Sequence, residues 1–106
     1  GKPKDAEDAR RMLRLISGRT HQVVTGVCLL TADKERCFSV TTDVTFKQLS
    51  EEEVTYYIEN YKPFDKAGSY GIQEWIGYVG VTSISGSYFN VMGLPVQRVW
   101  EEIRKL

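Results

Sequence analysis

The stretch HQVVTGVCLLTADKERCFSVTTDVTF, residues 21–46, decides the fold expected for this chain. Residues 21–30 are rich in Val, Thr and Leu, a composition that favours a strand. Residues 37–46 alternate Phe38, Val40, Thr42, Val44 and Phe46 with Ser39, Thr41, Asp43 and Thr45, which predicts a second strand. The polar run TADKER, residues 31–36, is short enough to join them as an antiparallel hairpin. We expect one face of this hairpin to be buried.

Both cysteines of the sequence lie in this hairpin. Cys28 and Cys37 are too few for a disulfide scaffold and too far apart in sequence for a paired zinc motif. If residues 32 and 33 form the middle of the turn, the two side chains lie opposite each other. We expect a cytoplasmic protein, and because the cytosol is reducing, we expect both cysteines to remain thiols.

A helical pattern precedes the hairpin, over residues 5–17. Apolar residues recur there at helical spacing, with Asp5 placed to cap the start and Gly18 to end the helix. Its arginines could form an anion site, but this spacing is more typical of the solvated face of a helix. The arginines concerned are Arg10, Arg11, Arg14 and, beyond the helix, Arg19.

Further elements follow the hairpin. Ser50 and Glu53 form a capping box that starts a second helix, expected to end near Asn60. Glycines then break the periodicity, a short strand is expected over residues 78–84, and Pro95 opens a last helix. Together with the hairpin, these elements predict a mixed α/β fold.

Composition narrows the class of protein. The sequence has 106 residues, 42% of them hydrophobic, which is typical of one small globular domain. Fourteen Lys and Arg balance fourteen Asp and Glu, so no net positive field favours nucleic acid as a partner. No apolar run is long enough to cross a membrane, and the charged first ten residues are unlike a secretory signal. We therefore expect a cytoplasmic protein with no membrane partner.

Three strings carry a family resemblance: residues 5–27, residues 49–73 with DKAGSYGIQ at their end, and GSYFNVMGLPV, residues 86–96. In this order and spacing they resemble the Maf family of nucleoside triphosphate pyrophosphatases, in the branch that acts on dTTP and UTP. The resemblance implies a Maf/ITPase-like architecture and hydrolysis of a nucleoside triphosphate, including modified nucleotides, to the monophosphate and pyrophosphate. It also implies a divalent cation, Mg or Mn, and a homodimer.

The resemblance points to four residues of the candidate site. Lys2, in GKP, matches the family lysine that follows the catalytic acid and is the candidate catalytic residue. Gln73 matches the position associated with choosing the nucleobase, where an amide can both donate and accept a hydrogen bond. Asp65 and Lys66, in DKAG, could orient phosphate or metal, or could instead pair with each other or cap a turn. Gln73 could likewise be a simple loop cap.

Other residues of the matching strings are weaker candidates for the site. Ser87 and Asn90 could serve the backbone at a turn, and His21 is expected to have no catalytic role. After Gln73, this sequence places Glu74, Trp75 and Ile76 where the family usually has small residues, which bears on the shape of the base pocket.

The resemblance also implies a part of the enzyme that these 106 residues do not contain. The family's serine- and arginine-rich phosphate motif and its catalytic aspartate precede the GKP lysine. We therefore expect residues 1–106 to be the C-terminal portion of a single Maf-like domain, without its N-terminal strands and most metal ligands. No metal ligand is assigned in this sequence, and the chain alone is expected to be inactive. The alternative is a non-catalytic module that binds a nucleotide or associates with itself.

Overall fold

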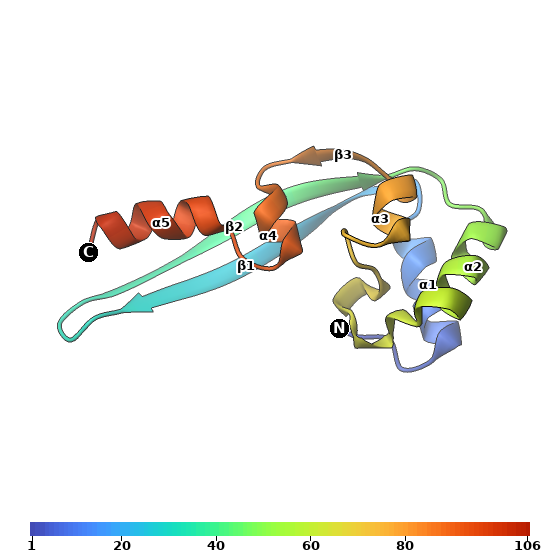
Figure 1. Cartoon of the computed structure of the whole chain (residues 1–106), viewed down its shortest axis with the longest axis horizontal. Helices are drawn as coiled ribbons and strands as arrows, with labels where there is room; N and C mark the ends of the chain where they lie inside the picture. Colours follow the sequence, from blue (N-terminus) through green and yellow to red (C-terminus); the bar gives the residue numbers. More distant parts are fainter. The chain divides into compact units, whose positions relative to one another are not determined.

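The computed structural model describes residues 1–106, the side chain of Ala67 excepted. Figure 1 follows the elements along the chain. They are α1 (Ala6–Ile16), β1 (Thr20–Leu30), β2 (Glu35–Phe46), α2 (Glu51–Tyr61), the 3-10 turns η1 (Pro63–Asp65) and η2 (Ala67–Ser69), α3 (Trp75–Gly80), β3 (Val81–Ser85), α4 (Tyr88–Met92) and α5 (Val96–Arg104).

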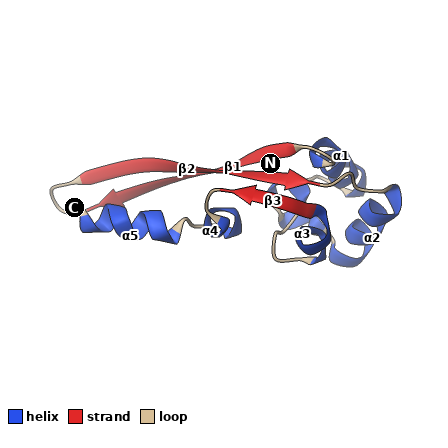
Figure 2. Ribbon diagram, turned by 90° about the horizontal axis from the view of Figure 1, so that it is seen from above, coloured by secondary structure: helices blue, strands red, loops and turns tan.

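The strands form one antiparallel sheet in the order β1-β2-β3 (Figure 2), so the expected mixed α/β fold is confirmed. The chain divides into two compact units. The first unit comprises Gly1–His21 and Val44–Ser83, and the second comprises Gln22–Asp43 and Ile84–Leu106. Among the described helices, none combines the length and apolar character needed to cross a membrane.

The hairpin of β1 and β2 has the turn predicted from the sequence. Thr31 N donates to Lys34 O at 2.8 Å, which places residues 32 and 33 in the middle of the turn. At the other end of the strands, Thr20 Oγ1 and Thr45 Oγ1 lie 2.7 Å apart. In both places the facing residue numbers add up to 65, so the same register holds at the two ends of the hairpin.

The hairpin also has the predicted burial of one face. Along β1 the odd-numbered residues are half-buried and the even-numbered ones exposed. On β2 the even-numbered residues are the less exposed, and Thr42, Val44 and Phe46 are fully buried. The period of two therefore arises because a single face of the hairpin is covered.

The two cysteines differ from expectation, because Cys28 and Cys37 are joined by a disulfide. Their Cα atoms are 4.1 Å apart. The register makes them a facing pair between two hydrogen-bonded pairs of the ladder, where side chains approach most closely. The expectation of free thiols was wrong because it rested on compartment, whereas the predicted turn already placed the two side chains opposite each other.

The helices of the first unit pack on one apolar core. Leu13 of α1, Tyr57 of α2 and Phe46 of β2 are among its buried side chains. Both ends of the capping box at Ser50 are formed, as predicted. Arg10 and Arg14 reach Glu51 at 3.1 and 2.8 Å, so these arginines tie α1 to the first turn of α2 and do not form an anion site.

The strand expected over residues 78–84 is corrected to a helix followed by a shorter strand. Helix α3 continues to Gly80, and β3 begins only at Val81. The short apolar run around Ile76 fits either conformation, and packing decides between them. Ile76 is fully buried on the helix, and Lys47 N donates to Gly80 O at 2.8 Å as the chain passes into β3.

Asn90 organises the second unit through its side-chain amide. Ser87 Oγ caps α4 by accepting from Asn90 N at 3.2 Å. Asn90 Nδ2 donates to two backbone carbonyls and one hydroxyl, those of Val23 (3.1 Å), Val40 (3.0 Å) and Thr42 (3.0 Å). Of the alternatives left open for Ser87 and Asn90, these bonds favour the structural one, because they attach α4 to both strands of the hairpin.

Helix α5 runs alongside the β1–β2 hairpin within the second unit (Figures 1 and 2). Its Glu102 is fully buried and pairs with Arg36, with Arg98 at 2.9 Å and with Lys105 at 3.6 Å. Hydrogen bonds from Arg36 and then Arg98 lower the pKa of Glu102 to about 2. The opposite face of α5 leaves an apolar stripe exposed, made of Val96, Trp100 and Ile103.

Candidate functional site

The candidate site begins with the GKP segment at residues 1–3. Pro3 is buried, and Lys4 N donates to Asp8 Oδ2 at 2.9 Å, so this segment is held against the start of α1. Gly1 O accepts from Gly68 N at 3.1 Å. The structure therefore places the backbone beside Lys2 next to the DKAG segment, and the Lys2 side chain is exposed.

The DKAG segment has a constrained backbone. Gly68 and Ser69 both have positive φ, 73° and 70°. This conformation is ordinary for glycine but costs energy for serine, and such strain is found most often at functional loops. Ser69 is fully buried, and among the described side chains its Oγ has no hydrogen-bond partner.

A polar network holds the segment that follows. Lys66 Nζ lies 3.4 Å from Glu74 Oε1, and the same carboxylate oxygen accepts from Tyr57 OH at 3.3 Å. Tyr57 OH in turn accepts from Gly71 N at 3.2 Å. Burial, with the charge of Glu74, raises the pKa of Tyr57, which therefore stays a neutral donor. The network joins α2 to both ends of residues 66–74.

Gln73 is presented by a tight turn. Glu74 N donates to Gly71 O at 3.1 Å, which puts Gln73 at the third position of the turn, with its side chain exposed. Ile72, just before it, is buried. A Cβ on Gly77 would lie 2.1 Å from Ile72 O, so only glycine allows α3 to approach this turn so closely.

His21 and Tyr70, the residue that follows the DKAGS run, form a second polar contact. His21 Nε2 and Tyr70 OH are 2.8 Å apart, and both rings contact Phe46, with centroids 5.8 and 5.1 Å away. Burial lowers the pKa of His21 and raises that of Tyr70 to about 12, so both are neutral near pH 7. This arrangement supports the structural role expected for His21.

The four predicted site residues all belong to the first unit, and the structure brings them together only in part. Lys66 is linked through Glu74 to the turn that bears Gln73, whereas Lys2 approaches DKAG through its neighbour Gly1. Asp65 is exposed at the end of η1. The alternative in which Asp65 and Lys66 pair with each other is not the contact seen, because Lys66 pairs with Glu74.

Sequence reasoning missed the roles of Tyr57, Glu74 and Trp75. The sequence did mark Glu74, Trp75 and Ile76 as unusual, and each has a packing role. Glu74 braces Lys66, Ile76 enters the core, and Trp75 packs on Tyr56, with ring centroids 4.8 Å apart. These three residues therefore help to hold the turn in place through their contacts, whereas the side chain of Gln73 stays exposed.

Comparison with known proteins agrees with these motifs. The model of the family described as "Maf-like protein" matches residues 1–106. The chain is similar to a protein of Phocaeicola vulgatus named dTTP/UTP pyrophosphatase, with 66% identity over 106 residues, which are 100% of this chain and 55% of that protein. Proteins of the same name from Bacteroides fragilis (59% identity, 100% of this chain, 55% of the relative) and Flavobacterium psychrophilum (57%, 94% and 51%) are also similar. The chain thus spans about half the length of the curated relatives it matches.

Proposed function

The chain belongs to the Maf-like protein family, and from this membership we propose that it is part of a nucleotide hydrolase. The proposed reaction cleaves dTTP, UTP or modified nucleoside triphosphates to the monophosphate and pyrophosphate. The observation that carries the proposal is the 66% identity, over all 106 residues, to a relative named dTTP/UTP pyrophosphatase. Because the chain spans about half of that relative, the activity is proposed for a protein of the relatives' length that contains it.

The exposed candidates are assigned by their chemistry. A triphosphate needs cations, and Lys2 is proposed as a point charge for it, with Lys66 as a second cation held by Glu74. Gln73 is proposed to read the base, because an exposed amide on a braced turn can donate to and accept from a pyrimidine edge. Asp65 is proposed to orient phosphate or metal. These roles rest on exposure and on the links between Lys66, Glu74 and the turn.

A divalent cation is expected for such a hydrolase, but the candidate residues do not form a site for Mg²⁺ or Mn²⁺. Such ions take several oxygen ligands. Among the described side chains, the only group of three potential ligands close enough to share an ion is Cys28, Glu35 and Cys37, which is not an oxygen site. Asp65 offers one carboxylate, and that of Glu74 is engaged by Lys66 and Tyr57. We propose that most ligands come from the part of the relatives outside the match.

The test is pyrophosphate release by a protein of the relatives' length that contains this sequence. With Mg²⁺ or Mn²⁺ present, dTTP and UTP should be cleaved, and finding both nucleotides intact would contradict the proposal. Replacing Gln73 with Ala should lower kcat/KM for dTTP about tenfold, because the loss of one hydrogen bond to the base costs about 1.4 kcal/mol. Gln97→Ala is the matched control, since Gln97 is an exposed amide in the second unit.

Residues 1–106 alone are expected to release no pyrophosphate. The described residues lack an oxygen-ligand cluster for the expected cation, and positioning by Lys2 and Gln73 cannot replace it. Measurable turnover by this chain, purified free of other hydrolases, would overturn that view. Titration with dTTP in the same preparation would reveal whether the chain binds nucleotide without cleaving it.

A self-associating module is the second candidate, and the exposed stripe on α5 favours it. Trp100 is 60% exposed, and Val96 and Ile103 are 48% and 45% exposed. A homodimer in which a second copy covers this stripe would remove that apolar surface from water. Sedimentation should then give twice the mass of one chain. The variant Trp100→Asp should sediment with the mass of a single chain, because a charge in the stripe opposes its burial. A monomer at all concentrations would argue against this dimer.

A further inference from the structure

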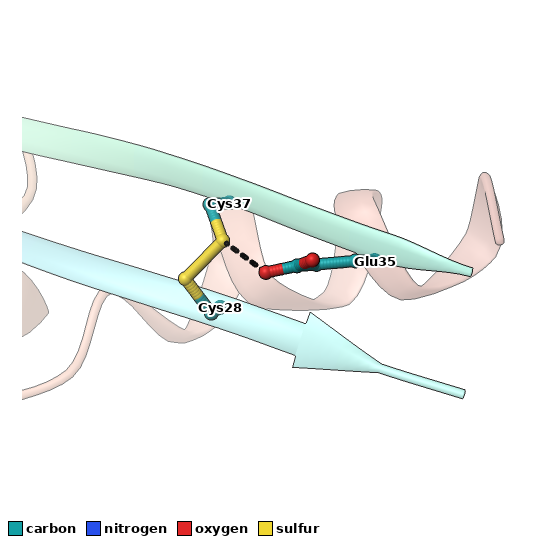
Figure 3. Close-up of side chains that lie close together, drawn as sticks. All are labelled: Cys28, Glu35 and Cys37. Atoms are coloured by element: carbon teal, nitrogen blue, oxygen red, sulfur yellow. Dashed lines mark hydrogen bonds between the residues drawn. A yellow bond between two sulfur atoms is a disulfide. The ribbon is translucent and has the colours of Figure 1, made fainter. Parts of the chain in front are cut away.

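The Cys28–Cys37 pair forms a cluster of potential metal ligands with Glu35 (Figure 3). Their ligand atoms, two sulfurs and a carboxylate oxygen, all lie within 4.8 Å of one another, and all three residues are exposed. The cluster lies in the second unit, on the face of the hairpin opposite the one that Asn90 and α4 cover. The proposed hydrolase does not use it.

We propose that this cluster, once its disulfide is reduced, binds a thiophilic divalent ion of the Zn²⁺ class through Cys28, Cys37 and Glu35. The disulfide is then the metal-free form of the same site. Thiolate sulfur is the ligand that selects Zn²⁺ over Mg²⁺, and two cysteines with one carboxylate and a water fill a tetrahedral shell. The inference is independent of the hydrolase, because it uses none of that site's residues.

Reduction of the disulfide requires a two-electron donor, and the proposed one is a small-molecule or protein dithiol. One thiolate of the dithiol attacks a sulfur of the Cys28–Cys37 bond and forms a mixed disulfide. Its second thiol then displaces the remaining cysteine, so the pair gains two electrons and two protons while the dithiol becomes a disulfide. When the ion binds, the two cysteine thiols release their protons to solvent as thiolates.

The spacing of the ligand atoms suits a tetrahedral ion. Bonds of about 2.3 Å to sulfur and about 2.1 Å to oxygen place neighbouring S and O ligands about 3.6 Å apart. Cys37 Sγ and Glu35 Oε1 are 3.5 Å apart. Two sulfurs on one such ion lie about 3.8 Å apart. Cα atoms separated by 4.1 Å allow this once the bond is broken, because rotation about χ1 moves each sulfur without moving the strands.

The surroundings leave the cluster free to take a cation. Arg36, the residue between Glu35 and Cys37, belongs to the other face of β2 and pairs with the buried Glu102. Its charge is therefore directed away from the sulfurs. Exposure of Cys28, Glu35 and Cys37 gives solvent access to the fourth coordination position.

Co²⁺ is the probe for the first experiment, because cobalt bound to thiolate gives a charge-transfer absorption that the aqueous ion lacks. The chain is reduced with a trialkylphosphine, which takes up the oxygen of a water as the disulfide becomes two thiols, and is then freed of reductant without oxygen. The absorption should rise to saturation at one Co²⁺ per chain and should disappear when Zn²⁺ is added. The chain with its disulfide intact should show no such absorption.

Four variants test the ligands. Cys28→Ser and Cys37→Ser should each abolish the absorption, and Glu35→Gln should weaken Co²⁺ affinity at least about tenfold. Asp33→Asn is the matched control, because it removes a carboxylate from the adjoining turn, outside the cluster, and the Co²⁺ affinity of this variant should change less than about twofold. Circular dichroism of each variant checks that the hairpin still folds.

Three results would overturn the proposal. The first is the absence of Co²⁺–thiolate absorption in the reduced chain, which would mean that the cysteine pair serves only to cross-link the two strands of the hairpin. The second is equal weakening by Glu35→Gln and Asp33→Asn, which would mean that Glu35 acts through charge alone. The third is one ion per two chains with a doubled sedimentation mass, which would mean that the ion bridges two hairpins.

Discussion

Replacing Gly77 with Ala is the sharpest test of how the Gln73 turn is held. A Cβ at residue 77 would lie 2.1 Å from Ile72 O, 2.6 Å from Ile72 C and 2.8 Å from Ile72 Cα. These are backbone atoms, so rotation of a side chain cannot relieve the overlap. Either α3 or the turn before it must move.

The sign of the effect separates two explanations. Helix propensity alone makes Ala about 1 kcal/mol better than Gly inside a helix. Overpacking costs about 1–3 kcal/mol, and a contact with backbone belongs at the upper end of that range. We therefore expect a net loss of about 2 kcal/mol in the free energy of unfolding of the first unit. For a chain of this size the melting temperature should fall by roughly 10 °C.

Urea unfolding followed by Trp75 fluorescence measures this loss, with Trp100→Phe in the background so that one fluorophore reports on the first unit. Gly26→Ala is the control, since a Cβ there meets nothing within 4 Å, and it should change stability by less than about 0.5 kcal/mol. A midpoint equal to or above that of the parent in Gly77→Ala would refute the close approach of α3 to Ile72. In a protein of the relatives' length, the same substitution should also raise the KM for dTTP.

Three further predictions concern other parts of the fold. Asn90→Ala should destabilise the second unit by about 1–3 kcal/mol, measured by Trp100 fluorescence, because buried acceptors lose their donor. His21, the single histidine, should have a pKa below 6.5 by NMR, because burial disfavours its charged form; its contribution to stability should be complete above pH 6.5 and should be lost as the pH falls from there through the lower pKa of the folded state, and a pKa above 6.5 would contradict its burial. Reduction of the Cys28–Cys37 disulfide should cost the hairpin up to about 2.7 kcal/mol in the loop-entropy model, and hydrogen exchange of the hairpin amides measures it.

Local patterns predicted most of the fold. The alternation over residues 37–46 and the capping box at Ser50 each depend on neighbours within a few residues, and both are confirmed. The strand expected over residues 78–84 is confirmed for residues 81–84, but residues 78–80 belong to α3, because the run around Ile76 fits a strand or a helix and tertiary packing decides. The state of the cysteines was also wrong, since sequence indicates which side chains face each other but not whether they are oxidised.

The candidate site was less predictable, because its contacts join distant residues. Glu74 meets Tyr57, seventeen residues away, and Gly68 meets Gly1 across most of the first unit's sequence. No periodicity encodes such pairs. The family resemblance indicated Lys2, Asp65, Lys66 and Gln73, and the roles given to them are predictions. The polar network of Lys66, Glu74 and Tyr57 that holds the Gln73 turn could be identified only from the folded structure.

The register of the hairpin limits how this sequence can change in length. Each residue of β1 faces the residue of β2 for which the two residue numbers add up to 65, both at the turn and at the far end of the hairpin. A single insertion in either strand would move every side chain beyond it to the opposite face. Related hairpins should therefore grow or shrink by one residue in each strand together, beside the turn. A cysteine pair in a related hairpin should occupy facing positions. Its two residue numbers should add up to 65 plus the shift caused by the added residues.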